Sequence, residues 1–245
     1  MIKTLTDYHI HTALCKHAAG DIEDYIIHAV KIGLTEIGFA DHIPLPGEFD
    51  IRHRMEENEL ETGYLNKIEV LKQKYKDQIT IRIGIEADYY PGTEKYVENI
   101  LRSYPFDFVI GSVHYINDWA LDCSEEMNGF HKQNLEKIYK AYFEQFALMV
   151  DTKLFDIAGH LDVIKRFGYK PKKGYFGLVE AIISKLKKNN MSVEINTSGL
   201  RRPVKEMYPS EDIILLLNNY GIKFTTGSDA HKPEQVGYRF DYLNE

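Results

Sequence analysis

Short apolar segments alternate along the chain with longer segments in which apolar residues recur every three or four positions. The first pattern is typical of buried strands and the second of amphipathic helices. The segments predicted as strands are residues 5–10, 36–41, 80–86, 107–112, 155–159, 192–196 and 223–228. The segments predicted as helices are residues 21–33, 58–76, 93–103, 132–151, 174–190 and 209–220. This alternation predicts an α/β fold built on a parallel sheet.

The positions of the polar residues favour a barrel over an open sheet. A histidine, aspartate or glutamate occurs at or just after the end of every predicted strand. An open sheet collects its ligands at one switch point, from a few strands. A closed barrel brings the carboxyl ends of all its strands round one mouth. We therefore predict a TIM-barrel-like fold of about seven strands, formed by one domain over residues 1–245, with the loop 43–57 at the mouth.

The stretch TDYHIHTALCKH near the N-terminus places polar residues on alternate positions of a predicted strand. Alternate side chains of a strand share one face, so His9 and His11 point the same way and Asp7 lies one step deeper. Asp229 and His231 repeat this spacing at the last strand. A lone histidine is more often a core or surface residue than a ligand, but here six of the ten histidines fall at strand ends. Those six are His9, His11, His42, His114, His160 and His231. A seventh, His17, lies in the first connecting loop. Their placement predicts a metal site.

The number of potential ligands indicates more than one metal ion. Together with Glu86 and Asp229, the seven histidines make nine ligands. One zinc or manganese ion takes three or four, so nine are ample for two or three ions. Cys15 lies in the same loop and could add a thiolate, although a thiol without metal is the simpler interpretation. Such a cluster suits hydrolysis of phosphate esters, because paired cations lower the pKa of a shared water and hold the phosphoryl oxygens.

Recognition of a phosphate needs cationic donors beside the metal ions. Two segments after predicted strands supply them: GHLDVIKRFGYKP contains Lys165 and Arg166, and EINTSGLRRPVKE contains Arg201 and Arg202. Arginines on a surface usually have no such role, but these follow strands at the predicted mouth. We favour Arg166 and Arg201 as the phosphate clamp, with Arg202 as the substitute. For His53, in the mouth loop, substrate contact and plain loop polarity remain equally open.

Composition limits the classes of partner. The net charge of −7 gives no bulk attraction to nucleic acid or anionic lipid. No apolar run approaches the ~20 residues of a membrane span, and the start MIKTLTDYHIH has no signal-peptide core. Two cysteines make no disulfide framework, which suits a reducing cytosol. We expect a cytoplasmic protein that binds a small phosphate monoester, and leave a homo-oligomer open.

With these residues in view, the sequence resembles the PHP (polymerase and histidinol phosphatase) superfamily over nearly its whole length. The stretches that carry the resemblance are DYHIHTALCKHAAGDIEDYIIHA, EIGFADHIPLP, GIEADYYPG, FDFVIGSVHY, AGHLDVIKRFGY, VEINTSGLRRPVKEMYPS and FTTGSDAHKPEQVG. Within them, LDVIKRFGY and INTSGLRRP are similar to the monofunctional histidinol-phosphatase branch of that superfamily.

The resemblance implies a distorted (β/α)7 barrel and three divalent metal ions, a mixture of zinc, iron and manganese. The implied ligands of the first ion are His9, His11, Glu86 and Asp229. Those of the second are Glu86 as a bridge, His114 and His160. Those of the third are His17, His42 and His231. Asp7 and Asp41 are outside this set, and we expect both to orient imidazoles. Asp41 is also a candidate catalytic residue that protonates the leaving alkoxide.

The reaction implied by the resemblance is hydrolysis of L-histidinol phosphate to L-histidinol and phosphate, in histidine biosynthesis. Arg166 and Arg201 would hold the phosphoryl oxygens as negative charge grows. Acidic residues of the mouth loop would receive the amine and imidazole of the substrate; the candidates are Glu48, Asp50 and Glu57. Two alternatives remain: another phosphoesterase, acting on nucleotides, sugar phosphates or phosphotyrosine, and a non-catalytic metal-binding module.

Overall fold

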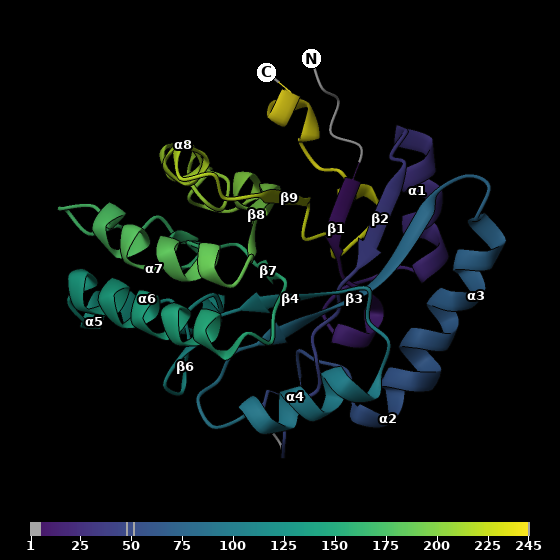
Figure 1. The fold of residues 1–245 in the computed structure, drawn as a ribbon, viewed down its shortest axis with the longest axis horizontal. Coiled ribbons are helices and arrows are strands. Elements are labelled where there is room, and N and C mark those ends of the chain that lie inside the picture. Colours follow the sequence, from purple (N-terminus) through teal and green to yellow (C-terminus); the bar gives the residue numbers. More distant parts are fainter. Residues whose placement is uncertain (1–5, 48, 51, 245) are drawn as a thin grey trace. The chain divides into compact units, whose positions relative to one another are not determined.

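The computed structural model of the chain describes residues 6–47, 49–50 and 52–244 (Figure 1). The chain divides into two compact units. The first unit comprises Met1–Ala87, Lys95–Ile110 and Thr225–Glu245. The second unit comprises Asp88–Glu94 and Gly111–Phe224. The expectation of one domain over the whole chain stays a prediction.

Seven strands form one sheet, and they follow each other in the sheet in chain order. The strands are β1 (Thr6–Ile10), β2 (Glu36–Phe39), β3 (Thr80–Asp88), β4 (Phe108–Ser112), β7 (Ile157–Ala158), β8 (Ser192–Asn196) and β9 (Phe224–Gly227). After β9 the chain returns to β1, where the Ala230 N–H donates to the carbonyl of His9 over 3.1 Å and the His11 N–H to the carbonyl of Ala230 over 2.9 Å. Parallel strands in sequential order, with the end of the last beside the first, are the topology of a (β/α)7 barrel. The predicted fold class is confirmed.

Helices connect the strands, as the periodicity predicts. They are α1 (Ile22–Ile32), α2 (Glu57–Glu59), α3 (Asn66–Tyr75), α4 (Glu94–Ser103), α5 (Gly129–Lys132), α6 (Leu135–Thr152), α7 (Phe176–Lys188) and α8 (Glu211–Asn219). A π-helical segment, Leu60–Leu65, separates α2 from α3, where the sequence predicts one helix over 58–76. A small hairpin of β5 (Tyr115–Ile116) and β6 (Trp119–Ala120) was not predicted. Among the described residues, no helix is long and apolar enough to cross a bilayer.

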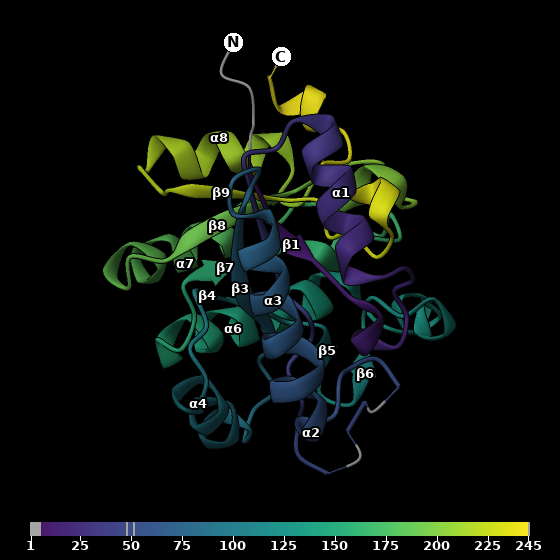
Figure 2. The same cartoon turned by 90° about the vertical axis from the view of Figure 1, so that its right-hand side faces the viewer.

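In the first unit, helices α1 and α3 lie alongside strands β1 to β3 (Figures 1 and 2). The ring of Phe108 packs where two glycines of neighbouring strands leave room for it. A Cβ atom at Gly38 would lie 2.6 Å from this ring, and one at Gly84 only 2.3 Å from it. Tyr8 of β1 contacts the same ring edge-on, with centroids 5.4 Å apart. This packing holds β1, β2 and β3 together behind the ends that carry the polar residues.

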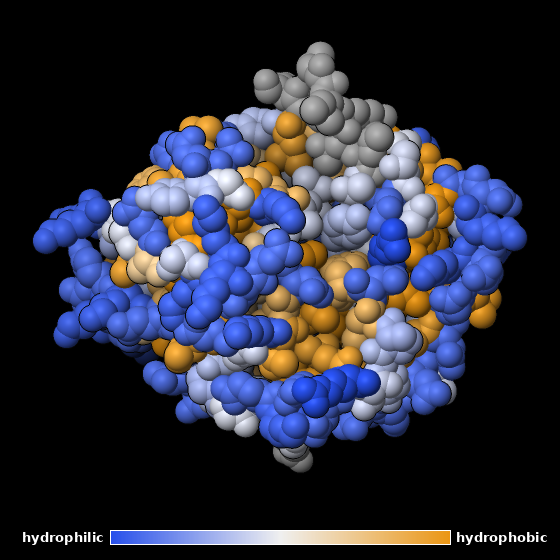
Figure 3. All heavy atoms as spheres, viewed as in Figure 1, coloured by the Kyte–Doolittle hydropathy of each residue, from blue (hydrophilic) through white to orange (hydrophobic). Residues whose placement is uncertain are grey.

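In the second unit, α6 packs against α7. Their apolar faces contribute buried residues such as Tyr142, Phe146 and Ile182, while hydrophilic side chains cover much of their outer surface (Figure 3). Tyr175, which precedes α7, stacks on Phe143 of α6 with ring centroids 5.9 Å apart. The hydroxyl of Tyr142 donates to the carbonyl of Leu161 over 3.1 Å. Through Tyr142, α6 therefore anchors the turn that follows β7.

Candidate metal centre

At the end of β1 two buried imidazoles, those of His9 and His11, lie on one face of the sheet, as the strand period predicts. The rings of His9 and His11 have centroids 5.0 Å apart, and both side chains are buried. One carboxylate oxygen, Oε2 of Glu86, lies 3.4 Å from Nε2 of His9 and 3.5 Å from Nε2 of His11. The same Nε2 of His11 lies 3.4 Å from Oδ1 of Asp229. The four groups predicted for the first ion thus lie together in the first unit.

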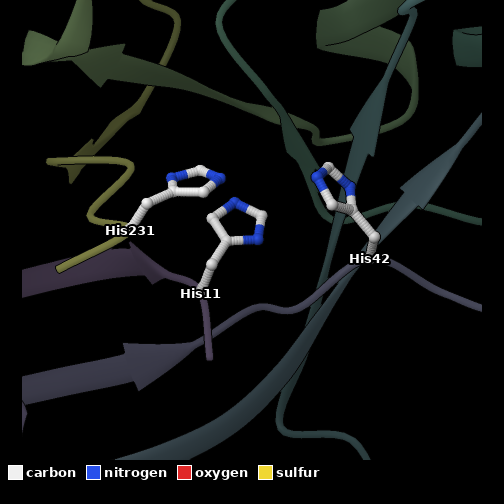
Figure 4. A group of neighbouring side chains, drawn as sticks. All are labelled: His11, His42 and His231. Atoms are coloured by element: carbon white, nitrogen blue, oxygen red, sulfur yellow. The ribbon is translucent and has the colours of Figure 1, made fainter. Parts of the chain in front are cut away.

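Two further imidazoles of the same unit join this group. Figure 4 shows the rings of His11 and His231 side by side with His42 as their neighbour, and each residue follows a different strand, β1, β9 or β2. The His11 ring centroid lies 4.5 Å from that of His42 and 4.2 Å from that of His231. One ligand atom from each of the three lies within 4.8 Å of the others. His42 also approaches Glu86, with Nδ1 3.0 Å from Oε2. The position of Glu86 suits a carboxylate that bridges two cations.

The contact between His17 and His231 tests whether the residues present fit a cation. Nδ1 of His17 lies 2.7 Å from the carbonyl of Cys15, and Nδ1 of His231 lies 3.0 Å from the carbonyl of Asp229. A carbonyl only accepts, so both Nδ1 atoms carry the proton and both Nε2 atoms present a lone pair. These two Nε2 atoms lie 2.8 Å apart. Two lone pairs so close repel each other unless a cation lies between or beside them. The donor set therefore fits a metal ion.

The protonation states of these groups agree with a cation site. Partial burial and the charges of His42 and His11 lower the pKa of His17 to about 4. Burial and His11 hold the pKa of His231 well below its ordinary value. Both rings are therefore neutral at pH 7, as ligands must be.

Asp229 and His11 form the charged part of the cluster. Burial alone would raise the pKa of Asp229, but its hydrogen bond with His11 and the neighbouring imidazoles hold it well below the ordinary value. Burial alone would lower the pKa of His11, but hydrogen bonds with Asp229 and Asp41 raise it well above that value. Without metal, the carboxylate of Asp229 is ionised and the ring of His11 carries an extra proton. A bound cation would replace that proton.

The carboxylates of Asp41 and Asp7 have different hydrogen-bond partners. Asp41 is fully buried, with Oδ1 3.5 Å from Nδ1 of His11, and its carboxylate accepts from the Thr12 N–H over 3.1 Å. This suits the predicted orienting role, while its role as proton donor stays a prediction. Asp7 accepts backbone N–H groups instead, from Ser228 and Gly237 over 2.9 Å and from His9 over 3.3 Å. The prediction that Asp7 orients an imidazole is wrong: it ties the two terminal segments together.

The second unit holds the other two predicted ligands, His114 and His160. Their Nε2 atoms lie 3.1 Å apart, and both side chains are buried. Nδ1 of His114 forms a short hydrogen bond with the buried carboxylate of Asp88, so its Nε2 is the atom left for a metal. The backbone N–H of His160 donates to Glu194 over 2.8 Å. Asp88 thus holds the ring of His114, and Glu194 holds the backbone of His160, with the two Nε2 atoms close together.

Asp88 is a functional residue that the sequence analysis missed. It orients His114 as a carboxylate typically orients a metal-binding imidazole. A signal was present, because Asp88 stands two positions after Glu86 in β3 and shares its face. The spacing alone does not predict which imidazole donates to the carboxylate of Asp88.

The predicted phosphate clamp comes from two turns of the second unit. Arg166 follows the 3-10 turn Val163–Lys165, and Arg201 ends the 3-10 turn Thr197–Arg201 with Arg202 next to it. Nη1 of Arg166 lies 3.4 Å from Oδ2 of Asp122. The N–H of Val204 donates to the carbonyl of Arg166 over 3.1 Å, so the two turns are joined through the backbone. The clamp itself stays a prediction.

Arg54 links described residues of the mouth loop to one another. Arg54 is buried and donates to Oδ2 of Asp50 over 2.9 Å and to the carbonyl of Ile43 over 3.1 Å. The other oxygen of Asp50 lies 2.6 Å from Nδ1 of His53, whose ring centroid is 5.5 Å from that of His17. His53 therefore stands beside the cluster, and substrate contact stays a prediction.

The structure also bears on two carboxylates predicted to bind the substrate, Glu57 and Glu48, and on the possible thiolate ligand Cys15. Glu57 is exposed at the start of α2 and accepts from Tyr96 over 2.8 Å. Glu48 lies outside the described residues. Cys15 is buried, and one ligand atom each from Cys15, His17 and His231 lie within 4.8 Å of one another. The thiolate alternative therefore stays open.

Comparisons with known proteins extend this picture. Residues 7–198 match the PHP domain family, and residues 214–239 match the family described as PHP-associated. The chain is 37% identical to the probable histidinol-phosphatase of Deinococcus radiodurans, over 96% of this chain and 90% of that protein. It is 30% identical to the histidinol-phosphatase of Bacillus subtilis, over 98% of both.

Solved structures of the same kind superpose on the chain. The putative histidinol phosphatase of Listeria monocytogenes gives a TM-score of 0.89 at 25% identity, over 97% of this chain and 99% of that one. The histidinol phosphate phosphatase of Lactococcus lactis, complexed with zinc, L-histidinol and phosphate, gives a TM-score of 0.82 at 26% identity. That match covers 98% of this chain and 91% of the other.

Replacing His9 by alanine removes one ring nitrogen from the cluster of the first unit. We expect bound metal to fall by about one ion per chain, because each ion needs three or four protein ligands. Mass spectrometric metal analysis of the purified protein measures this content. His28→Ala is the matched control, because His28 lies on α1 and is not one of the converging imidazoles. Equal metal content in the two variants would contradict a metal centre at His9.

Metal binding at neutral pH should release about one proton per chain, because the raised pKa of His11 keeps its ring protonated until a cation replaces the proton. Binding should weaken as the pH falls and largely vanish near pH 4, where His17 also becomes protonated. Titration calorimetry of zinc in two buffers of different ionisation enthalpy measures the released protons. Identical binding heats in both buffers would count against this proton exchange.

Proposed function

We propose a function for this chain from one premise: it belongs to the PHP domain family. The chain is a histidinol-phosphatase, a phosphoric monoester hydrolase that converts L-histidinol phosphate to L-histidinol and inorganic phosphate. The observation that carries this conclusion is its match to curated histidinol-phosphatases along nearly its whole length. The converging imidazoles agree with it, because phosphate ester hydrolysis needs cations at the reacting group.

The cofactors that we propose are three divalent metal ions, a mixture of zinc, iron and manganese. The proposed ligands are His9, His11, His17, His42, Glu86, His114, His160, Asp229 and His231. The facing lone pairs of His17 and His231, and zinc in the related structure from Lactococcus lactis, support divalent cations. Bound there, such ions would lower the pKa of a water and neutralise the phosphoryl oxygens.

Different residues are proposed to bind the cations, to orient His11 and to hold the phosphoryl group. Glu86 and Asp229 supply negative charge that fixes the cations, and Asp41 keeps His11 in one orientation. Arg166 and Arg201 hold the phosphoryl oxygens through planar guanidinium groups, which match the geometry of a phosphate. They act more strongly on the transition state, in which the phosphoryl oxygens gain charge.

The part of the substrate that is not phosphate is cationic at its amine and polar at its imidazole. Asp50 and Glu57 are the described carboxylates of the mouth loop proposed to receive these groups. His53, fixed by Asp50, is proposed to contact the substrate beside His17, with Arg202 as an additional phosphate donor. Asp41 is the proposed donor of the proton to the leaving alkoxide.

We further propose that the protein works in the cytoplasm. Cys15 and Cys123 are free thiols, which suits a reducing compartment.

Steady-state kinetics test the proposed function. The metal-loaded protein is assayed on L-histidinol phosphate and, at equal concentrations, on a nucleoside monophosphate, a sugar phosphate and phosphotyrosine. The proposal expects the highest kcat/KM for L-histidinol phosphate. A higher value for any other ester would assign the chain to a different phosphoesterase, and no turnover with zinc, iron or manganese would favour a non-catalytic module.

Replacing Arg201 by alanine tests the phosphate clamp. We expect KM for L-histidinol phosphate and the inhibition constant of inorganic phosphate to rise about tenfold, because a charge-assisted hydrogen bond is lost. Inhibition kinetics with inorganic phosphate measure the second constant. Arg102→Ala is the matched control, since Arg102 is exposed on α4, where it pairs with Glu98. If phosphate inhibits both variants equally, Arg201 does not bind phosphate.

A further inference from the structure

A fully buried lysine lies beside the proposed phosphate clamp without belonging to it. The side chain of Lys165 is 0% exposed, and its Nζ lies 2.8 Å from Oδ2 of Asp162 and 3.3 Å from Oε2 of Glu206. The same Nζ lies 5.6 Å from the centroid of the Tyr208 ring. Burying an ion pair costs the hydration of both charges, and an apolar replacement is often as stable. The buried ion pair of Lys165 therefore need not stabilise the fold, and its role is better explained by the segments that it joins.

The carboxylate partners of Lys165 are themselves firmly held. Asp162 is fully buried, and its Oδ2 accepts from the Tyr175 hydroxyl over 2.9 Å and from the Ser210 N–H over 3.2 Å. Glu206 also accepts from Lys170. Burial would raise the pKa of Glu206, but Lys170 and Lys165 hold it below its ordinary value. The ammonium of Lys165 thus bridges two fixed anions.

These two anions lie on the two segments that carry the arginines. Asp162 precedes the turn Val163–Lys165 and Lys165 is its last residue, directly before Arg166. Glu206 lies near the end of the loop that begins with the turn ending at Arg201. Three contacts thus link the two segments: the backbone hydrogen bond from Val204 to Arg166, the exposed pair of Lys170 with Glu206, and the buried bridge through Lys165.

The second segment is a closed loop. At its base Asn196 and Tyr208 pair through two backbone hydrogen bonds of 2.7 and 2.9 Å. Inside it Gly199 lies so close to Glu206 that an added Cβ would be 1.9 Å from the Glu206 carbonyl oxygen, a position that only glycine can occupy. A loop closed at its base and packed on itself moves as one piece. The bridge to Lys165 then fixes where that piece stands relative to Arg166.

We propose that Lys165 is a positioning residue: it holds the turns of Arg166 and Arg201 at one spacing, so that both guanidinium groups are arranged for a phosphate before it binds. The inference rests on the proposed function, because it takes Arg166 and Arg201 as phosphate ligands. Lys165 is fully buried, so it acts through the arginines and does not contact the substrate. A clamp that is arranged beforehand loses less conformational entropy on binding, and a small misplacement weakens it strongly.

Lys165→Met removes the ammonium and keeps most of the side-chain volume. Calorimetric titration of the metal-loaded protein with inorganic phosphate should show affinity about fivefold to tenfold weaker than wild type, as expected for a misplaced clamp. Affinity for L-histidinol, which has no phosphoryl group, and metal content should be unchanged. A general structural defect would weaken both ligands together, and that result, or unchanged phosphate affinity, would overturn the proposal.

A milder variant keeps the test decisive if Lys165→Met does not fold. Glu206→Gln removes the charge from a carboxylate whose side chain is 37% exposed, and should weaken phosphate affinity in the same direction. Asp151→Asn is the matched control, because it breaks the partly exposed pair of Asp151 with Lys185 in the same unit and should leave phosphate affinity unchanged. Phosphate affinity of Glu206→Gln equal to that of the control would overturn the proposal.

A double-mutant cycle distinguishes an action through the arginine from an independent effect. In an Arg201→Ala background, Glu206→Gln should weaken phosphate affinity by a clearly smaller factor than in the wild-type background. Equal factors in both backgrounds would overturn the proposal. These measurements follow phosphate binding without turnover. A failure to hydrolyse L-histidinol phosphate would therefore count against the proposed function alone.

Discussion

The facing ring nitrogens of His17 and His231 are the constraint on which the rest of the account depends. Each imidazole donates a hydrogen bond from its Nδ1–H to a backbone carbonyl, so the two Nε2 atoms turn lone pairs towards each other at 2.8 Å. Neutral rings in this arrangement repel, whereas a divalent cation converts the repulsion into coordination. The nearby carboxylates of Glu86 and Asp229 add the negative charge that such a cation requires. The architecture of the first unit keeps these groups together.

Ordinary strand geometry supplies that architecture. The period of two in β1 directs His9 and His11 to one face, and the return of the chain after β9 brings Asp229 beside them. Phe108, packed into the space left by Gly38 and Gly84, binds the strands behind them into a compact core. Asp7 completes the arrangement by accepting backbone N–H groups from both terminal segments. His9 and Glu86 therefore lie in strands, and the other ligands of this unit lie in the connections that follow β1, β2 and β9.

Much of this could be predicted from the sequence, because the signals were periodic. Alternation of apolar segments predicted the strands and helices, and polar residues at strand ends predicted the barrel. Hydrogen-bond partners could not be predicted, because they depend on distances between segments far apart in the chain. Asp7 was thus assigned to an imidazole although it binds backbone, and Asp88 was missed although it orients His114. The π-helical segment Leu60–Leu65 left no trace in the apolar periodicity of 58–76.

Anomalous X-ray diffraction from crystals of the zinc-loaded, active protein measures whether these imidazoles bind metal, because it locates zinc without reference to activity. We expect anomalous peaks about 2.0–2.1 Å from ring nitrogens of His9 and His11. We expect a further peak at the same distance from Nε2 of His17 and of His231. Crystals of active protein with no zinc peak at these nitrogens would contradict a metal centre at these residues.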